Sequence, residues 1–370
     1  MGLIRLLLAI SVMITHQTGQ YTYMVAGDMA VQSFFIISGF FMSYIITEKY
    51  RQKKNGYRLF ITNRLLKIYP TYWLVAGFIL IAIMISPKLN TVDARYDFLR
   101  YYMHHPRELQ VSTWVYAAEI NIFTLGAESA YFFGFNAVKG ILYYAQNLTS
   151  PPIRAMNFVL VYQAWILPLE IYFYCISPYI LKQKLKWIVL IIVGTGIARY
   201  YLSTVGMFWD YEPWIRRFFF TQIGIFLLGR ISYDIYVKMH TRKLPKRLPA
   251  VITLGMVLMI IFYYQIPNLT LYHFDVNRSL YTLLFTAAIP FVFLYTKTVR
   301  LDRLLGELSY PVFLTHAIVI DMVRSYAPVW EKTYGSSVLY ILVFLVSYAI
   351  YRFLMKPIDA FRQRRVHSLP

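Results

Sequence analysis

An arginine and a histidine share the first apolar segment of the chain, residues 3–18. Arg5 stands near the start of this segment and His16 near its end. At about 100° and 1.5 Å per residue, a helix places both side chains on one face, roughly 16 Å apart along the axis. Ionisable groups inside hydrocarbon are costly and usually mark functional sites. The pair is therefore a candidate site built on a titratable imidazole, although Arg5 snorkelling and His16 at the outer interface would give the same pattern.

Two cations open the third apolar segment, in the stretch from Arg64 to Trp73. Arg64 and Lys67 lie one helical turn apart and are followed by Tyr69, Pro70 and Tyr72. A guanidinium fork and an ammonium group together are suited to binding phosphates. An interface anchor with an aromatic belt is the structural alternative.

A carboxylate lies inside the apolar segment 157–181. Glu170 follows Trp165 by about one and a half turns. Such a group needs a proton or a cation, so an internal ion pair is the structural alternative to a binding role. The candidate cations are Arg5, Arg199, Arg230 and Arg324.

Two further stretches stand out in apolar surroundings. Ser38-Gly39, within residues 27–43, permits close approach of another backbone, and packing alone would explain it. Leu305–His316 contains Tyr310 and a second intramembrane histidine, His316, although a lone histidine is more often a core residue than a catalyst.

Composition predicts an all-α, polytopic integral membrane protein. Of 370 residues, 58% are hydrophobic and 15% charged, whereas soluble domains are nearer 45–50% apolar and about 25% charged. The net charge of +20 comes from short clusters between apolar runs, which argues against a nucleic-acid partner. One cysteine, Cys175, allows no intramolecular disulfide, and no zinc pattern is present, so no metal is expected.

About ten transmembrane helices are predicted, and membrane lipids are expected partners. Basic clusters follow the second, fourth, sixth, eighth and tenth segments, so both termini are expected in the cytoplasm. The segments are 3–18, 26–46, 68–86, 157–181, 187–204, 216–237, 249–267, 278–296, 309–326 and 337–355.

The predicted domain organisation is one transmembrane domain, residues 1–356, and a short basic cytoplasmic tail, residues 357–370. No signal-peptide cleavage site follows the first segment, which indicates a retained helix. The long outer connection, about 87–157, is expected to form amphipathic or re-entrant helices that act as a lid or acceptor platform, or an interfacial helix resting on lipid.

Five ordered motifs together resemble acyltransferase family 3, and the resemblance covers essentially the whole chain. The matching stretches are Arg5 and His16 for Arg-x10-His, Phe34–Phe40 for FFxxSGF, Arg64–Tyr72 for RxxRIxPxY, Trp165–Pro178 for WSLxxExxFYxxxP, and Leu305–His316 for LGxxSYxxxLxH.

The resemblance implies a multi-pass O-acyltransferase of the bacterial cytoplasmic (inner) membrane. Such an enzyme moves an acyl group, usually acetyl from acetyl-CoA, to a sugar hydroxyl of an exopolysaccharide, lipopolysaccharide or related glycan. His16 would be the general base or nucleophile, in preference to His316. Arg5 would orient the site or hold the pantetheine-phosphate arm, and Glu170 would orient a ligand or neutralise an arginine. Arg64 and Lys67 would hold the phosphates of CoA, and Trp165, Tyr310 and His316 would contact substrate.

The chain departs from the family pattern in three respects. Lys67 replaces the second arginine of the basic motif, and Ile166 replaces a small polar residue. The SGNH-type hydrolase extension of some members is also absent. Two other functions remain open: a transporter or flippase for a glycan or lipid-linked sugar, and a structural partner in an envelope assembly. No inverted repeat is evident, which disfavours transport.

The alternation of basic and poorly charged loops makes the topology testable. Reporters fused after Pro370 or within residues 238–247 should read cytoplasmic, and a reporter within residues 90–113 should read extracytoplasmic. Phosphatase and fluorescent-protein fusions measure this directly. The opposite readout at these sites would reverse the orientation and move the predicted CoA entrance.

Overall fold

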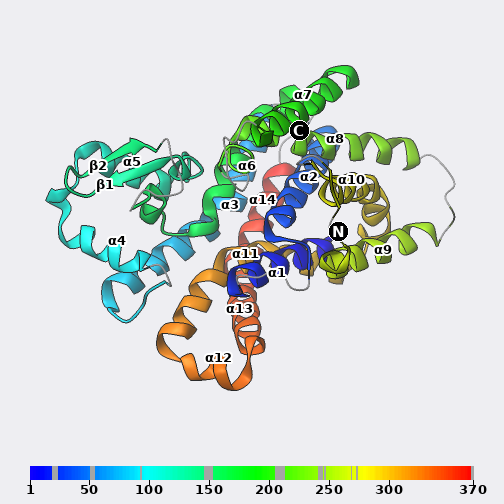
Figure 1. Cartoon of the computed structure of the whole chain (residues 1–370). Helices are drawn as coiled ribbons and strands as arrows, with labels where there is room; N and C mark the ends of the chain where they lie inside the picture. The colour runs from blue at the N-terminus through cyan, green and yellow to red at the C-terminus, as the bar shows by residue number, and fades with distance from the viewer. Residues whose placement is uncertain are drawn as a thin grey trace. The chain divides into compact units, whose positions relative to one another are not determined.

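The computed structural model describes residues 1–18, 24–50, 55–91, 94–145, 153–204, 213–240, 245, 247–267, 269–271 and 274–367 (Figure 1). The basic residues at 51–54, 241–244 and 246, which contribute to the predicted topology, lie outside these ranges. The chain forms two compact units, and the unit boundaries fall inside three helices, α3, α6 and α11.

Unit 1 comprises residues 1–66, 170–313 and 356–370. It contains α1 (Gly2–Thr18), α2 (Gly27–Ile45), the start of α3 (Gly56–Ile85), most of α6 (Ile166–Ile180), α7 (Leu185–Thr204), α8 (Phe219–His240), α9 (Leu248–Phe262), the hairpin β3 (Thr270–Leu271) and β4 (Phe274–Asp275), α10 (Val276–Thr296), the first half of α11 (Arg300–Tyr326), and α14 (Lys356–His367).

Unit 2 comprises residues 67–169 and 314–355. It contains the remainder of α3, α4 (Arg95–His104), α5 (Val111–Ile122), the antiparallel hairpin β1 (Phe133–Asn136) and β2 (Ile141–Tyr144), the start of α6, the second half of α11, α12 (Pro328–Tyr334) and α13 (Ser336–Ile350).

Seven helical segments of the described chain are long and apolar enough to cross a membrane. They are Gly27–Tyr50, Gly56–Ile85, Leu185–Thr204, Leu248–Gln265, Val276–Thr296, Arg300–Tyr326 and Ser336–Val366, and α1 is a shorter apolar helix. The helical membrane-protein class is thus supported, whereas ten crossings and cytoplasmic termini remain predictions. The apolar run 157–181 is not one helix: two 3₁₀ turns, Ala155–Phe158 and Tyr162–Trp165, precede α6.

Glycines allow α2 and α8 to pack backbone against backbone in unit 1. A Cβ added at Gly39 would lie 1.8 Å from the carbonyl oxygen of Phe226. The reciprocal Cβ at Gly229 would lie 2.1 Å from the carbonyl oxygen of Ile36. The close approach predicted for Ser38-Gly39 is therefore confirmed, and it needs a glycine on each helix.

The N-terminus of α1 is capped by a carboxylate from α11. Asp302 accepts hydrogen bonds from the main-chain N–H groups of Gly2, at 2.7 Å, and Leu3, at 2.9 Å. The first N–H groups of a helix have no partner within the helix, and a negative charge there also complements the helix dipole. This contact fixes the end of α1 that carries Arg5.

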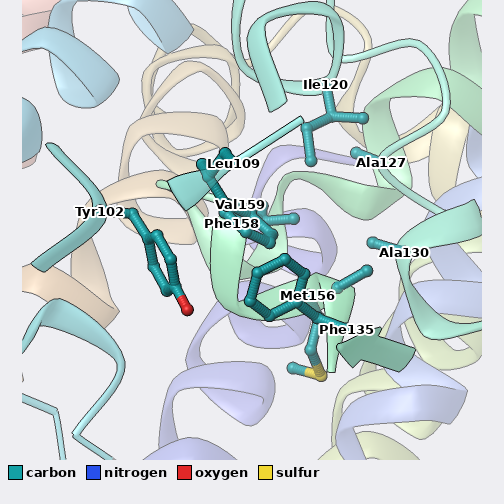
Figure 2. Packing of buried hydrophobic residues seen from close by; sticks show 10 residues of the cluster. Tyr102, Leu109, Ile120, Ala127, Ala130, Phe135, Met156, Phe158 and Val159 are labelled. Carbon is teal, nitrogen blue, oxygen red and sulfur yellow. The ribbon is translucent and has the colours of Figure 1, made fainter. Parts of the chain in front are cut away.

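The connection between α3 and α6 has a hydrophobic core of its own within unit 2. Figure 2 shows this cluster of buried side chains, in which Phe135 and Phe158 pack edge to face. The other labelled members are Tyr102, Leu109, Ile120, Ala127, Ala130, Met156 and Val159.

Arg100 of α4 ties this connection to the C-terminal end of α3. Its Nε donates to the carbonyl oxygen of Ile83 at 3.0 Å, and its Nη2 donates to those of Ser86, at 2.8 Å, and Leu89, at 3.1 Å. Ile83 lies in the last turn of α3, where carbonyl groups lack intrahelical partners, and Ser86 and Leu89 lie in the segment just after the helix. The Arg100 guanidinium therefore caps the C-terminal end of α3 and fixes the position of α4 against it.

Aromatic side chains of α3 bind the middle of the connection, at the C-terminus of α5. Tyr72 Oη donates to the carbonyl oxygen of Asn121 at 2.9 Å, and Trp73 Nε1 donates to that of Ile122 at 2.8 Å. Tyr69 Oη donates to the carbonyl oxygen of Phe123.

Trp73 precedes the end of α3, Ile85, by twelve residues, about 18 Å of helix. The C-terminus of α5 therefore folds back along α3, away from the end where the connection begins. The placement of this connection relative to the membrane, as a re-entrant segment, a lid or an interfacial helix, remains a prediction.

The tight contact between α2 and α8 yields a stability prediction. Gly39→Ala should lower the free energy of unfolding by about 1–3 kcal/mol, because the new Cβ meets rigid backbone. Thermal unfolding in detergent measures this. Gly194→Ala is the matched control, since a Cβ at Gly194 on α7 meets no atom within 4 Å. Equal melting temperatures for both variants would show that α2 and α8 do not pack this closely.

Candidate functional site

Arg5 and His16 lie on one uninterrupted helix, α1, which spans Gly2–Thr18. The predicted three-turn spacing between them therefore applies. Arg5 is half-buried, whereas His16, in the last turn, is exposed. The imidazole is accordingly accessible at the end of α1 opposite to Arg5.

Arg5 lies against the start of the late motif on α11. A Cβ added at Gly306 would be 3.7 Å from Arg5 Nη1 and 3.0 Å from the Cα of Gly2. Gly306 therefore leaves room both for the guanidinium and for the backbone of α1. Tyr310, half-buried, follows Gly306 by one helical turn and so shares its face of α11.

Three predicted motifs meet at Tyr174 in unit 1. The Tyr174 hydroxyl donates to Glu170, one turn earlier on α6, and the ring is buried. The guanidinium of Arg64 from α3 and the hydroxyl of Ser38 from α2 also act electrostatically on this phenol. Glu170, Arg64 and Ser38 therefore surround one buried tyrosine, although they are far apart in sequence.

The other arginines considered as partners of Glu170 have contacts of their own. Arg230 pairs with Asp234 at 2.9 Å, and Arg324 pairs with Glu331 at 3.2 Å. Arg199 donates to the main-chain carbonyl oxygens of residues 215 and 221. Arg64, which was predicted as a phosphate ligand and not as a partner of Glu170, acts on Tyr174, the residue that donates to Glu170.

Lys67 follows Arg64 by one turn on α3 and is half-buried. Both cations lie on the same continuous helix, which keeps the predicted spacing. The side chains of Tyr69, Tyr72 and Trp73, which follow them, bind the end of α5, as described above. This part of α3 thus carries two candidate phosphate ligands and three aromatic residues that hold α5 in place.

Gln163 joins two other motifs within unit 2. Its Nε2 donates to the carbonyl oxygen of Leu314 at 2.7 Å, and the side chain is 3% exposed. This bond connects the turn that holds Trp165, a half-buried residue, to the helix that holds His316. His316 itself is fully buried, and Thr315 beside it shares a 3.1 Å hydrogen bond with Ser347 of α13.

Tyr174 and Gln163 were not predicted as site residues. A tyrosine four residues after an intramembrane glutamate was a usable signal, because positions i and i+4 share a helix face. Gln163 offered no such signal, since its acceptor lies 151 residues away. Among the described residues, no three His, Cys, Asp or Glu side chains cluster as metal ligands would.

The comparisons with known proteins give one match. A family model described as an acyltransferase domain, that of acyltransferase family 3, matches residues 1–352. No curated protein and no solved structure matches the chain. The matched range includes every candidate site residue, from Arg5 to His316. The chain therefore belongs to acyltransferase family 3.

Proposed function

We propose that this membrane acyltransferase transfers an acetyl or similar acyl group from acyl-CoA to a sugar hydroxyl of a bacterial surface glycan. An exopolysaccharide, a lipopolysaccharide or a related glycan is the acceptor, and the bacterial inner membrane is the location. The donor is cytoplasmic and the acceptor lies at or beyond the outer face, so the helices would supply the path between them.

One observation carries the proposal: the family's arginine–histidine pair is present on a single helix with its histidine exposed. A catalytic base must reach the proton that it removes. His16 satisfies this requirement at the end of α1, whereas His316 is fully buried. His16 is therefore the better candidate for the reacting group.

The proposed chemistry uses neutral His16 in one of two ways. As general base, the imidazole takes the proton of the sugar hydroxyl while the oxygen attacks the thioester carbonyl. The carbon–sulfur bond breaks, CoA leaves as a thiolate, and the proton passes to sulfur. As nucleophile, the imidazole first accepts the acyl group and then passes it to the hydroxyl. Both routes yield an ester and free CoA.

The remaining candidates would position the substrates. Arg5, a fixed cation on the same face of α1, would orient the site or hold the pantetheine-phosphate arm of the donor. Arg64 and Lys67 would hold the CoA phosphates, with Lys67 acting as a point charge where the family pattern has a second guanidinium. Glu170, held by Tyr174, would keep Arg64 oriented toward the donor.

Trp165 and Tyr310, both half-buried, are proposed to contact substrate, and His316, predicted as a third contact, is fully buried and would support them from within the fold. The bond from Gln163 to Leu314 links the turn of Trp165 to the helix of His316, which supports a shared role for these two residues within unit 2. Tyr310 lies on the α11 face that carries Gly306, next to Arg5.

His16→Ala tests the enzyme mechanism. Transfer should fall by roughly a hundredfold to ten-thousandfold, the usual contribution of general acid–base catalysis, while acyl-CoA binding and melting temperature are retained. His16→Asn should not restore the rate, since an amide cannot carry the proton at neutral pH. The measurement is transfer of radiolabelled acetyl from acetyl-CoA to candidate glycans by the purified protein.

His316→Ala is the comparison for this test and should lose less activity. Because His316 is fully buried, its variant is also checked for stability. A His16→Ala protein that acylates at near the wild-type rate would exclude the mechanism and make the transporter the leading alternative.

Donor binding provides a separate test of the basic motif. Neutralising Arg64 and Lys67 together should raise the KM for acyl-CoA about tenfold to a hundredfold, the effect of losing a charged hydrogen bond, with a much smaller change for the glycan. Arg58→Gln is the matched control, since Arg58 is an exposed cation on the same helix. An unchanged donor KM in the double variant would leave Arg64 and Lys67 as interface anchors.

A further inference from the structure

The predicted tail, residues 357–370, contains an ordered helix, α14, that docks onto the start of α3 in unit 1. Arg362, 6% exposed, donates from Nε to the carbonyl oxygen of Asn63 at 2.8 Å. Arg365 donates from Nη1 to Asn63 Oδ1 and from Nη2 to Thr62 Oγ1, both at 2.9 Å. Two arginines of α14 thus donate hydrogen bonds to Thr62 and Asn63, the two residues immediately before Arg64.

Asn63 extends this network to the end of α2. Its side chain is 1% exposed, and its Nδ2 donates to Tyr50 Oη at 3.1 Å. Tyr50 closes the π-helical turn that also carries Lys49. The hydrogen bonds therefore hold three segments together around Arg64.

Positive charge concentrates at this junction. The charges of Arg64, Arg303 and Arg362 all act on the ammonium group of Lys49, and Arg64 also acts on Arg362. Lys49 and Arg303 are exposed, and Arg64 is half-buried. Lys49 thus lies within the field of three arginines, and α14 supplies one of these and binds the residues just before another, Arg64.

Acidic groups compensate this charge only in part. Asp359 pairs with Arg362, and Glu307 lies close enough to act on the same guanidinium. Arg64 Nε is buried and has no hydrogen-bond acceptor in the described part of the chain. A buried donor without an acceptor costs free energy unless a ligand provides one. The junction therefore suits an anion with several charges.

From this geometry we infer that α14 is part of the donor site: Lys49, Arg64 and Arg303 bind the nucleotide phosphates of acyl-CoA, and Arg362 and Arg365 are the residues that position them. The identity of the anion rests on the proposed function. The nucleotide of CoA carries a diphosphate and a 3′-phosphate, which matches a cluster of separated cations. An anionic lipid headgroup offers the same chemistry from another source.

The test measures binding of acetyl-CoA to the full chain in nanodiscs of zwitterionic lipid. Arg362→Gln should weaken acetyl-CoA binding about tenfold or more, because loss of the bond to Asn63 displaces Arg64 and with it a charged hydrogen bond to the phosphates. The affinity of this variant for acetyl-pantetheine, which lacks the nucleotide, should equal that of the wild type. Arg303→Gln should also weaken acetyl-CoA binding, by a few-fold, and it leaves the docking of α14 intact.

Arg364→Gln is the matched control. Arg364 carries the same charge on the same helix, two residues after Arg362, and is exposed. Its substitution should leave acetyl-CoA affinity within about twofold of the wild type.

Three results would count against the inference. The first is that the Arg362→Gln and Arg303→Gln variants bind acetyl-CoA as tightly as the Arg364→Gln control. This result would overturn the inference about α14 and leave the proposed function standing. An equal loss of acetyl-pantetheine affinity would show that Arg362 supports the fold alone. A wild-type protein that binds no acetyl-CoA, but shows Arg362-dependent binding of phosphatidylglycerol, would overturn both this inference and the proposed donor.

Discussion

Main-chain groups at the helix ends have no partners within their own helices, and the side chains that bind them organise much of the molecule. Asp302 accepts from the first N–H groups of α1, and Arg100 donates to the carbonyl oxygen of Ile83 in the last turn of α3 and to that of Ser86 just after it. Each unmade bond of this kind would cost several kcal/mol in hydrocarbon by order of magnitude. The side chains that make these bonds also fix the end of α1 next to Arg5 and orient α4.

The motif residues divide into those that support the fold and those available for chemistry. Tyr72 belongs to the basic motif, yet its hydroxyl is used by the carbonyl oxygen of Asn121. Gly39 belongs to the Ser-Gly motif, and its lack of a side chain allows α2 to touch α8. Arg64 and His16 are the motif residues with the chemistry for binding and catalysis, a guanidinium for phosphates and an exposed imidazole for the proton.

Arg5 and Arg64, the two arginines of the proposed reaction, are positioned by different contacts. Arg5 lies in a space created by Gly306 on α11, so it depends on the contact between α1 and α11. Arg64 lies beside the Glu170–Tyr174 pair and follows the two residues that α14 binds. Transfer from a nucleotide-bearing donor to a glycan would require both arrangements, one for the phosphates and one for the reacting carbonyl.

Local periodicity allowed the sequence by itself to determine the membrane class, the shared helix face of Arg5 and His16, the one-turn spacing of Arg64 and Lys67, and the close approach at Gly39. These features depend on neighbouring residues of one helix, and the family motifs follow from residue identity. The run 157–181 could not be resolved in this way, because hydropathy alone does not distinguish 3₁₀ turns from α-helix. Only the tertiary structure decided that Glu170 and Arg64 act on one tyrosine, that Gln163 binds Leu314, and that α14 grips Asn63. These contacts join residues from about a hundred to three hundred positions apart, and their partners are set by helix packing, which no local pattern encodes.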